Sequence, residues 1–485
     1  MKFHNTLTGA KEKFIPRQTG KVAMYVCGIT AYDYCHIGHA RAAVVFDVLV
    51  RFLRFSGYEV TFIRNFTDID DKIINRARET GQDSRAVAEQ FIAAFYEDME
   101  QLGVLQADIE PKATEHIQPM QDLIRKLIDK GHAYATPEGD VYFRVRSFPD
   151  YGRLSGRNIE ELKSGARIEP GEAKEDPLDF ALWKKAQPDE PSWPSPWGNG
   201  RPGWHIECSA MSEMYVGLPM DIHGGGQDLA FPHHENERAQ SEAAGGSTFV
   251  KYWLHNGFVR VNSEKMSKSL GNFITIRDIL HDYRPEVLRF FLLGKQYRSP
   301  LDFTWENLRE SERGLKRLLQ TRLQTETALE NQKWTDRDLP EEMLVEFQTA
   351  ARSWRQSLED DLNTAGSLGH CFTMNRLINR LLDDKQLRKS RGGQTMLREF
   401  INELDQLSQI LGLPFAEPGN RLKDLRLSRA ERKKIRSETV EELIARRQKA
   451  RQTKDFALAD QIRDQLTALG VTLMDTPSGP VWDVD

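Results

Sequence analysis

The fold is decided by residues 21–65, in which three stretches follow one another: Lys21-Val22-Ala23-Met24-Tyr25-Val26-Cys27-Gly28, His36-Ile37-Gly38-His39 and Tyr58-Glu59-Val60-Thr61-Phe62-Ile63-Arg64-Asn65. The first and third are short and mostly apolar, as expected of strands buried on both faces of a parallel sheet. Between them Val45, Val48, Leu49 and Phe52 recur at helical spacing, and Ser56-Gly57 predicts the helix end. The order predicts a βαβ unit.

The turn His36-Ile37-Gly38-His39 falls at the C-terminal end of the first predicted strand, where open α/β sheets bind their ligands. Gly38 allows close approach of a nucleotide, and the N-terminus of the following helix favours phosphate. His36 and His39 can donate hydrogen bonds to charge that grows on a phosphate during reaction. The four residues alone would favour two surface histidines near a turn. The βαβ context favours a nucleotide site.

A second motif, Lys265-Met266-Ser267-Lys268-Ser269, lies between the apolar run Phe258-Val259-Arg260-Val261 and Gly271-Asn272. It could be a solvated basic turn, but a mobile loop with two ammonium groups can also close over a triphosphate. The Gly-x-x-x-x-Gly-Lys-Ser/Thr phosphate-loop motif is absent from the sequence. In order and spacing, the histidine and lysine motifs resemble those of class I aminoacyl-tRNA synthetases. The resemblance implies an ATP site with catalytic His36, His39, Lys265 and Lys268, in which Gly38 and Lys268 bind ATP.

Four further residues bear on a metal site: Cys27, Cys208, His233 and Glu237. Two thiols, an imidazole and a carboxylate are an acceptable ligand set for zinc. His233 and Glu237 are four residues apart, so that on a helix they would share a face. The set contains no Cys-x-x-Cys pair, and residue types alone favour structural cysteines and a surface His/Glu pair.

Longer motifs resemble those of the cysteinyl-tRNA synthetases, and the resemblance extends over nearly the whole chain: Cys27-Gly28-Ile29-Thr30, Asn65-Phe66-Thr67-Asp68-Ile69-Asp70-Asp71-Lys72-Ile73, Gly203-Trp204-His205-Ile206-Glu207-Cys208-Ser209-Ala210-Met211, and residues 224–237, which end Phe231-Pro232-His233-His234-Glu235-Asn236-Glu237. In that family the positions matching Cys27, Cys208, His233 and Glu237 bind one zinc ion, to which the sulfur of the substrate cysteine also binds. The resemblance implies the same metal here.

The resemblance also suggests how the substrate is bound. Trp204 would line the amino-acid pocket, and Thr67 and Asp228 would hold the ammonium and polar groups of the cysteine, next to Cys27 at the metal. His205, His223 and His234 would surround the metal ligands. Ordinary alternatives remain, namely a core tryptophan and internally satisfied polar residues. Cys35 and Cys371 are most simply small buried hydrophobic residues.

Composition restricts the class of protein. The 485 residues include 67 Lys or Arg and 72 Asp or Glu, a net charge of −5, so that any RNA contact must be a local patch. Four cysteines argue against a disulfide framework and for a reducing cytoplasm. No signal peptide or apolar run of membrane-spanning length is found in the sequence. The family resemblance suggests a monomer that uses ATP with Mg²⁺, L-cysteine and tRNA(Cys).

The length predicts several domains. We expect an α/β Rossmann-like catalytic domain in two halves, 1–105 and 200–260, interrupted by a connective insertion, 106–199, which in the family helps to bind the acceptor end of tRNA. Residues 261–310 would hold the lysine loop and a stem-contact segment. An all-α helical bundle, 311–412, would follow, with Asn363 or Thr364 capping one of its helices. Residues 413–485 would form a small mixed α/β anticodon-binding domain.

The C-terminal residues provide the argument for RNA. Residues 421–454 contain thirteen Lys or Arg against five Asp or Glu. Thr439-Val440-Glu441-Glu442 predicts a capping box that opens a basic helix, and Asp455-Phe456 opens a second. Two short strands around Thr476-Pro477-Ser478-Gly479 would present Trp482 as an exposed aromatic for base stacking. The acidic ending Asp483-Val484-Asp485 does not fit an RNA contact, and a solvated charged face is the alternative.

These observations predict a zinc-dependent cysteine–tRNA ligase. Two alternatives stay open at this point. One is a related ligase that joins cysteine to an amino-sugar, as mycothiol ligases do, which would be expected to lack the C-terminal domain. The other is a non-catalytic RNA-binding protein on the same scaffold, which would be expected to have lost the histidine, lysine and metal motifs.

Overall fold

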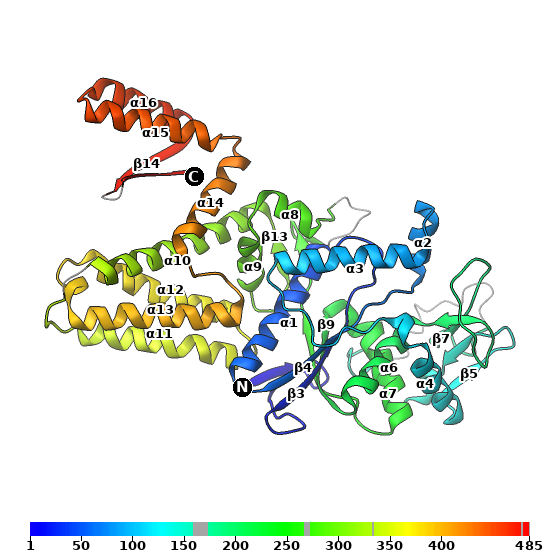
Figure 1. Ribbon diagram of the computed structural model, residues 1–485. Coiled ribbons are helices and arrows are strands. Elements are labelled where there is room, and N and C mark those ends of the chain that lie inside the picture. Colours follow the sequence, from blue (N-terminus) through cyan, green and yellow to red (C-terminus); the bar gives the residue numbers. More distant parts are fainter. Residues whose placement is uncertain (159–172, 266–271, 332–333, 477–478, 485) are drawn as a thin grey trace.

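The computed structural model describes residues 1–158, 173–265, 272–331, 334–476 and 479–484 (Figure 1). A parallel sheet lies at the centre, with an insertion on one side, a helical bundle on the other, and a small C-terminal unit that stands apart from the body. Among the described residues, no helix is both long enough and apolar enough to cross a membrane. The architecture confirms the predicted fold class.

The central sheet is built from the βαβ unit that the sequence predicts. Strand β3 (Lys21–Val26) leads into α1 (Ile37–Phe55), which returns to the parallel strand β4 (Glu59–Arg64). Strands β9 (Met220–Gly226) and β10 (Val250–Asn256), joined through α7 (Glu235–Gly245), extend the sheet in the order β10-β9-β3-β4, all parallel. Two halves that are distant in sequence thus form one Rossmann-like sheet.

Helix α1 packs within this core along its whole length, and Val45, Val48, Leu49 and Phe52 are all buried. Ser56 caps its C-terminus, as predicted. At the end of β3 the chain passes so close to the segment after β4 that a Cβ atom on Gly28 would lie 1.5 Å from the Asn65 carbonyl oxygen. The amide of Gly28 donates to Asn65 Oδ1 at 2.9 Å, which fixes the approach.

The insertion has its own sheet and core. Its antiparallel strands, in the order β5-β6-β7-β8, are β5 (Ala133–Ala135), β6 (Val141–Phe143), β7 (Phe180–Lys185) and β8 (Gly200–Pro202). Helix α4 (Ile117–Asp129) precedes them and packs on α6 (Trp204–Val216), which follows them. The other helices described in residues 1–199 are α2 (Asp71–Thr80), α3 (Ser84–Gln101), and the short helices η1 (Ala113–Glu115) and η2 (Val145–Ser147).

After the central sheet the chain forms a three-stranded sheet, in the order β12-β11-β13, from β11 (Val259–Val261), β12 (Glu264–Lys265) and β13 (Leu301–Phe303). Helices α8 (Ile276–Asp282) and α9 (Pro285–Leu293) lie between β12 and β13 in the sequence. The helical bundle comprises α10 (Trp305–Asn331), α11 (Glu341–Glu359), α12 (Thr364–Asp383) and α13 (Arg391–Leu411), with η6 (Leu387–Lys389) before α13. Asn363 caps α12, as predicted.

Helix α14 (Pro418–Arg432) joins the bundle to the C-terminal unit, which contains α15 (Ser437–Gln452), α16 (Phe456–Ala468) and the hairpin β14 (Val471–Thr476) with β15 (Gly479–Val484). The hairpin and the Asp455 cap of α16 confirm the prediction. The predicted capping box at Thr439 is wrong, because α15 already begins at Ser437 and its N-cap Arg436 makes no side-chain cap hydrogen bond.

The prediction that Trp482 is an exposed aromatic is also wrong. Its side chain is 3% exposed, packs in the apolar core of the C-terminal unit and lies under the Arg426 guanidinium. The acidic residue beside it has a structural role, because Asp483 pairs with Lys316 of α10 and with Arg429 of α14. The large exposed aromatic of this unit is Phe456, at the start of α16, which is 62% exposed.

A buried ion pair joins the central sheet to the bundle. Asp47 of α1 pairs with Arg289 of α9 and, at 2.9 Å, with Arg51. The Arg289 guanidinium also donates to the carbonyls of Leu411, at the end of α13, and of Leu102, after α3. Asp47 and Arg289 are both fully buried, so neither charge has water to replace its partner.

We therefore expect Asp47→Ala to lower the free energy of unfolding by about 3–5 kcal/mol, because it leaves the Arg289 charge buried without a counter-charge. Thermal and guanidinium unfolding followed by circular dichroism would measure the change. The matched control is Glu59→Gln, at an exposed pair with Lys21, which should cost less than about 1 kcal/mol. Equal effects of the two substitutions would contradict a structural role for the buried pair.

Candidate active site

A cavity of about 400 Å³ opens at the carboxyl ends of the parallel strands. It is lined by the chain after β3 (Cys27, Gly28), the start of α1 (His36, Gly38, His39), and residues at or after the ends of β9 and β10 (Gly226, Asp228, Asn256, Phe258). In doubly wound sheets this edge is where ligands bind. The predicted nucleotide residues and one predicted metal ligand therefore share a single cavity.

The histidine turn is rigid because it forms the cap of α1. His36 is the N-cap residue, and its Nδ1 accepts hydrogen bonds from the amides of Gly38 at 3.0 Å and His39 at 3.4 Å. His39 Nδ1 accepts from the His36 amide at 3.2 Å, and the two rings stack with centroids 3.8 Å apart. Burial, with the nearby charges of His36 and Lys72, holds the pKa of His39 well below its usual range, so that its imidazole is neutral.

The lysine motif is described at its first residue only, and the chain after it contacts the histidine turn. Lys265 lies in β12, while Lys268 and the other residues of 266–271 lie outside the described residues. Where the described chain resumes, it pairs with the histidine turn: the Ile37 amide donates to the Ile274 carbonyl, and the Ile276 amide to the Cys35 carbonyl. The Phe273 ring also packs edge-on against His36. The segment that follows the lysine motif in the sequence therefore contacts the histidine turn.

The four predicted metal ligands converge. Their ligand atoms, Cys27 Sγ, Cys208 Sγ, a His233 ring nitrogen and a Glu237 carboxylate oxygen, all lie within 4.8 Å of one another. The two sulfurs are 3.6 Å apart, Cys27 Sγ is 3.4 Å from Glu237 Oε1, and His233 Nε2 is 3.0 Å from the same oxygen. They come from β3, α6, the π-helical turn η4 (Ala230–His234) and α7, so only the tertiary fold assembles them.

A ring of histidines surrounds these ligands, as the sequence suggested for His205, His223 and His234. His205 Nδ1 lies 3.0 Å from His233 Nδ1, His223 Nε2 lies 3.2 Å from Glu237 Oε2, and His234 Nε2 lies 3.3 Å from Cys27 Sγ. His255, which the sequence analysis did not single out, contacts His234 Nδ1 at 2.7 Å and, through its own Nδ1, the Thr6 hydroxyl. Cys27, His223, His234 and Glu237 form a second candidate ligand set.

The charges of the cluster fit a metal. Burial opposes ionisation of Cys208, but hydrogen bonds from Cys27 and His233 lower its pKa to about 6, which favours the thiolate. Burial also opposes ionisation of Glu237, yet His223 and His233 hold its pKa well below the usual range. Burial opposes a charge on His233, but Glu237 and Cys208 raise its pKa to about 10, so that its imidazolium balances part of this negative charge. A bound metal ion would take the place of that proton. A thiolate, a thiol, an imidazole and a carboxylate whose ligand atoms lie within 4.8 Å of one another suit zinc.

The predicted substrate residues lie around this cluster, with different surroundings. Trp204 lines the cavity and stacks on the His233 ring, with centroids 4.2 Å apart. Asp228 lines the same cavity from η3 (Gln227–Leu229) and is exposed to solvent. Thr67 is buried, and its hydroxyl donates to the Glu207 carboxylate at 2.6 Å. That hydroxyl is therefore oriented by Glu207, the residue before the ligand Cys208.

Sequence reasoning missed several cavity residues that carry charge or polarity, among them Lys72 and Asn256. Lys72, at the start of α2, lines the cavity and places its ammonium group 5.3 Å from the centre of the Tyr32 ring. Asn256, at the end of β10, lines the opposite wall. Their only signal in the sequence was position: Lys72 ends the Asp68-Ile69-Asp70-Asp71 run, and Asn256 precedes Gly257 at the end of an apolar stretch.

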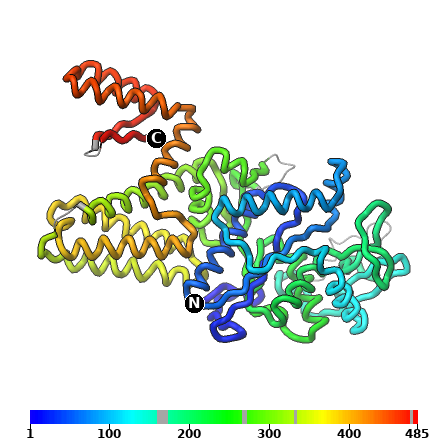
Figure 2. Tube along the Cα trace, viewed as in Figure 1, coloured from blue at the N-terminus to red at the C-terminus, as the bar shows by residue number. Residues whose placement is uncertain are grey.

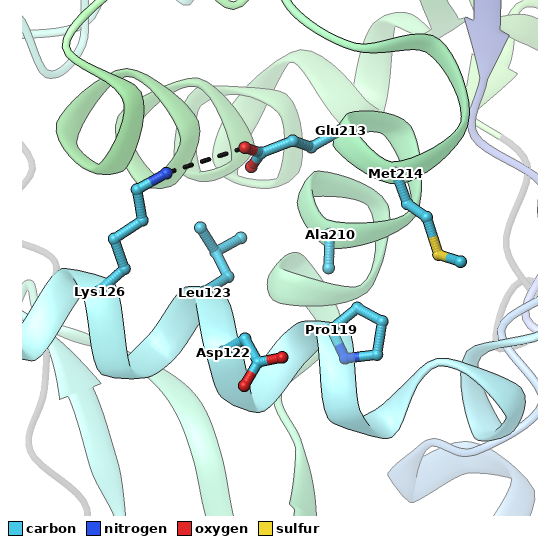
Figure 3. Close-up of a pocket in the computed structure, with 7 residues that line it drawn as sticks. All are labelled: Pro119, Asp122, Leu123, Lys126, Ala210, Glu213 and Met214. Carbon is cyan, nitrogen blue, oxygen red and sulfur yellow. Dashed lines mark ion pairs between the residues drawn. The ribbon is translucent and has the colours of Figure 1, made fainter.

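A second, smaller cavity of about 220 Å³ lies between α4 and α6 (Figure 3). It is lined by Pro119, Asp122, Leu123, Lys126, Ala210, Glu213 and Met214, and one side carries the Lys126–Glu213 ion pair at 3.8 Å. None of these seven side chains is a thiol or an imidazole. Of these two cavities, only the larger is lined by thiol and imidazole side chains.

The chain is similar to known proteins along its whole length. Three family models match in order: the class I (C) tRNA synthetase catalytic domain over residues 13–313, the DALR domain over residues 353–416, and the cysteinyl-tRNA ligase anticodon binding domain over residues 436–482. Cysteine–tRNA ligases of Maridesulfovibrio salexigens, Nitratidesulfovibrio vulgaris and Lawsonia intracellularis are 60%, 60% and 54% identical to this chain over 484 residues, and each comparison covers 100% of both chains.

Solved structures share the fold at much lower identity. The Mycobacterium tuberculosis methionyl-tRNA synthetase in complex with methionyl-adenylate has a TM-score of 0.64 at 14% identity, covering 82% of this chain and 93% of that one. The LeuRS of Agrobacterium radiobacter K84, in a ternary complex with tRNA and LeuAMS, has a TM-score of 0.59 at 13% identity, covering 84% and 87%. With the full-length matches above, the conclusion is direct: the chain belongs to the cysteine–tRNA ligase family of class I tRNA synthetases.

Proposed function

We propose that the chain is a zinc-dependent cysteine–tRNA ligase, which activates L-cysteine with ATP and transfers it to the 3′ end of tRNA(Cys). The observation that carries the proposal is the convergence of Cys27, Cys208, His233 and Glu237 at the end of the same cavity that holds the histidine turn. Full-length relatives named cysteine–tRNA ligase support the substrate and the acceptor.

Substrate selection follows from the metal ligands. Zinc bound by Cys27, Cys208, His233 and Glu237 would offer a Lewis acid that holds the substrate sulfur as a thiolate, which a serine hydroxyl replaces poorly. Trp204 closes the pocket beside His233, and Asp228 offers a carboxylate for the substrate ammonium group. Thr67, oriented by Glu207, offers a hydroxyl near the ligand Cys208. A metal–sulfur bond removes the need for a separate editing site.

In the activation step a carboxylate oxygen of cysteine forms a bond to the α-phosphorus of ATP. The bond from that phosphorus to the bridging oxygen breaks, and pyrophosphate leaves with the electron pair. His36 and His39, held at the N-terminus of α1, stabilise the charge on the phosphate, where Gly38 permits close approach. Lys265 and Lys268 would neutralise the pyrophosphate, with Mg²⁺ accompanying the ATP.

In the second step a hydroxyl of the terminal ribose of the tRNA attacks the carbonyl carbon of the adenylate, and AMP leaves. The C-terminal unit lies apart from the central sheet and is joined to the bundle by α14 (Figure 1). The cations of α15, of which Arg447 and Arg451 pair with Asp475, together with the exposed Phe456 support binding of a single-stranded loop by phosphate contacts and base stacking. We assign base stacking to Phe456 rather than to Trp482, because Trp482 is buried.

We further propose that the enzyme acts as a monomer in the reducing cytoplasm, where its four thiols stay reduced; all four cysteines are free in the structure. The two alternative functions are not favoured. An amino-sugar ligase would not be expected to carry the anticodon binding domain that matches residues 436–482. A non-catalytic paralogue is disfavoured by the full-length identity of about 60% to named ligases and by the assembled cluster.

The proposal is tested by charging total bacterial tRNA with radiolabelled cysteine or serine in the presence of ATP. We expect acid-precipitable cysteine that depends on tRNA, and discrimination against serine of roughly 10⁴-fold without an editing site. Folded, zinc-loaded protein that charges no tRNA, yet joins cysteine to an amino-sugar, would instead establish the first alternative.

Removal of one metal ligand should release the metal. We expect one zinc per chain after dialysis, and roughly 0.1 or less in Cys208→Ala, because a three-ligand protein site loses most of its affinity. Elemental analysis measures the ratio. Cys371→Ala, a buried thiol in α12 far from the cluster, is the matched control and should keep its zinc. Full zinc in Cys208→Ala would refute the ligand assignment.

Truncation of the exposed aromatic should weaken only the RNA step. We expect Phe456→Ala to raise the KM for tRNA by about 5- to 100-fold, the loss of one stacked base, and to leave tRNA-independent ATP–pyrophosphate exchange unchanged. Leu469→Ala, at another exposed apolar side chain of the same unit, is the control and should alter neither value. An unchanged KM for tRNA in Phe456→Ala would argue against stacking at this residue.

A further inference from the structure

One wall of the catalytic cavity is built on a segment that is distant in sequence. The cavity is lined here by Asn256, Gly257, Phe258 and Val259. These residues contact residues 296–301, which lead from α9 into β13. The Gly257 amide donates to the Tyr297 carbonyl at 2.8 Å, and the Leu301 amide donates to the Phe258 carbonyl at 2.9 Å. The contact is tight, since a Cβ atom on Gly257 would lie 2.4 Å from the Arg298 carbonyl oxygen. The wall therefore follows any shift of this segment.

Arg41 of α1 fixes the carbonyl groups of both partners. Its guanidinium is fully buried and donates to Phe258 O at 2.9 Å through one terminal nitrogen. The other terminal nitrogen donates to the carbonyls of Ser299 at 2.5 Å, Tyr297 at 3.1 Å and Gln296 at 3.3 Å. Burial lowers the pKa of Arg41 to about 10, so that it remains charged at neutral pH.

All four acceptors of Arg41 are neutral backbone carbonyls, an uncommon arrangement for a buried charge, which proteins usually pair with a carboxylate. The desolvation of the guanidinium is offset here only if all these carbonyls stay in place. Arg41 is two residues after His39 in the first turns of α1. A single side chain therefore ties the helix that presents the histidine turn to the opposite wall of the cavity.

The side chains of the same segment are held from the other direction by Asp361, in the turn between α11 and α12 of the bundle. Its carboxylate accepts from the Tyr297 hydroxyl at 3.0 Å and from Arg298 Nε at 2.8 Å, and its carbonyl accepts from Gln296 Nε2 at 2.9 Å. Asp361 is fully buried and adopts a left-handed backbone conformation, with φ +65°.

Asp361 also fixes the N-terminal strand β1 (Lys2–Asn5), because its carboxylate accepts from the His4 amide at 2.8 Å and its own amide donates to the Lys2 carbonyl. The N-terminus lies beside the end of the bundle in the chain trace (Figure 2). Three separate parts of the molecule, namely the N-terminal strand, the bundle and segment 296–299, thus meet at one carboxylate.

We propose that Arg41 and Asp361 act as a clamp on segment 296–299, and that this clamp positions the wall Asn256–Val259 for ATP. Both are positioning residues, since the contacts described for them are with the protein backbone and with side chains outside the cavity. The inference rests on the proposed function, in which this cavity binds ATP. Through Asp361, ATP binding would then depend also on the turn between α11 and α12 of the bundle.

The clamp predicts a selective kinetic effect. The metal cluster is carried by β3, α6, η4 and α7, and none of these elements supplies the wall Asn256–Val259. Loosening the clamp should therefore weaken ATP binding and leave cysteine binding and zinc content almost unchanged. A merely structural role would lower stability and affect both substrates alike.

The test measures ATP–pyrophosphate exchange by the full-length protein, with KM for ATP, KM for cysteine, kcat, zinc content and melting temperature. The variants are Arg41→Lys, which keeps the charge but loses the guanidinium fork, and Asp361→Asn, which keeps the shape and tolerates the left-handed backbone. Asp360→Asn is the matched control, because the Asp360 carboxylate is exposed and pairs with Lys11 at the surface.

We expect Arg41→Lys to raise the KM for ATP by about 10- to 100-fold, as a small displacement of a binding wall does, with the KM for cysteine changed by less than about twofold. Asp361→Asn should raise the KM for ATP in the same direction by about 3- to 10-fold, and Asp360→Asn should match the unmodified protein. Because the two variants perturb different sides of the segment, one remains informative if the other fails to fold.

The clamp is refuted if both folded, zinc-loaded variants retain the KM for ATP of the unmodified protein, or if the KM values for ATP and cysteine rise together. These outcomes leave the proposed function standing, because the unmodified protein still catalyses cysteine-dependent exchange. Failure of the unmodified protein to catalyse that exchange would overturn the proposed function, and the clamp with it.

Discussion

The packing of helix α1 into the central sheet is the constraint on which the rest of the molecule depends. Its first turn holds His36 and His39 at the mouth of the cavity, its second holds the opposite wall through Arg41, and its third carries Asp47 to the buried Arg289. Because Arg41 and Asp47 are fully buried, neither can be displaced without leaving a polar group without a partner. One helix therefore aligns the catalytic cavity with the bundle.

The metal cluster imposes a second requirement on the fold. Burial opposes a charge on Cys208 and Glu237, but hydrogen bonds from Cys27 and His233 at Cys208, and the charges of His223 and His233 at Glu237, lower the pKa of each group. The histidines around them orient the ligands, and His255 connects that ring to Thr6 near the N-terminus. Zinc would complete a site whose charges are otherwise only partly compensated, which links the selection of the substrate sulfur to the stability of the core.

Much of the architecture could be predicted from local pattern. Strands β3 and β4, helix α1, the cap at Asn363 and the helix opened by Asp455 agree with the sequence because each depends on neighbouring residues. Two predictions in the C-terminal unit failed. The start of α15 was placed at a capping box that the chain does not use, and Trp482 was assigned to the surface although it fills the core of the unit. Burial of an aromatic depends on what packs against it, which local sequence does not reveal.

The sequence by itself determined the histidine and lysine motifs and the family resemblance, which assigns Cys27, Cys208, His233 and Glu237 to a metal, because these are properties of residue type and order. The tertiary structure alone decided which of these groups meet. It brought β3, α6, η4 and α7 to one point, placed Lys72 and Asn256 in the cavity, and set Arg41 and Asp361 on either side of segment 296–299. The physical reason is that hydrogen bonds and ligand contacts act over a few ångströms, and only the packing of distant segments creates those distances.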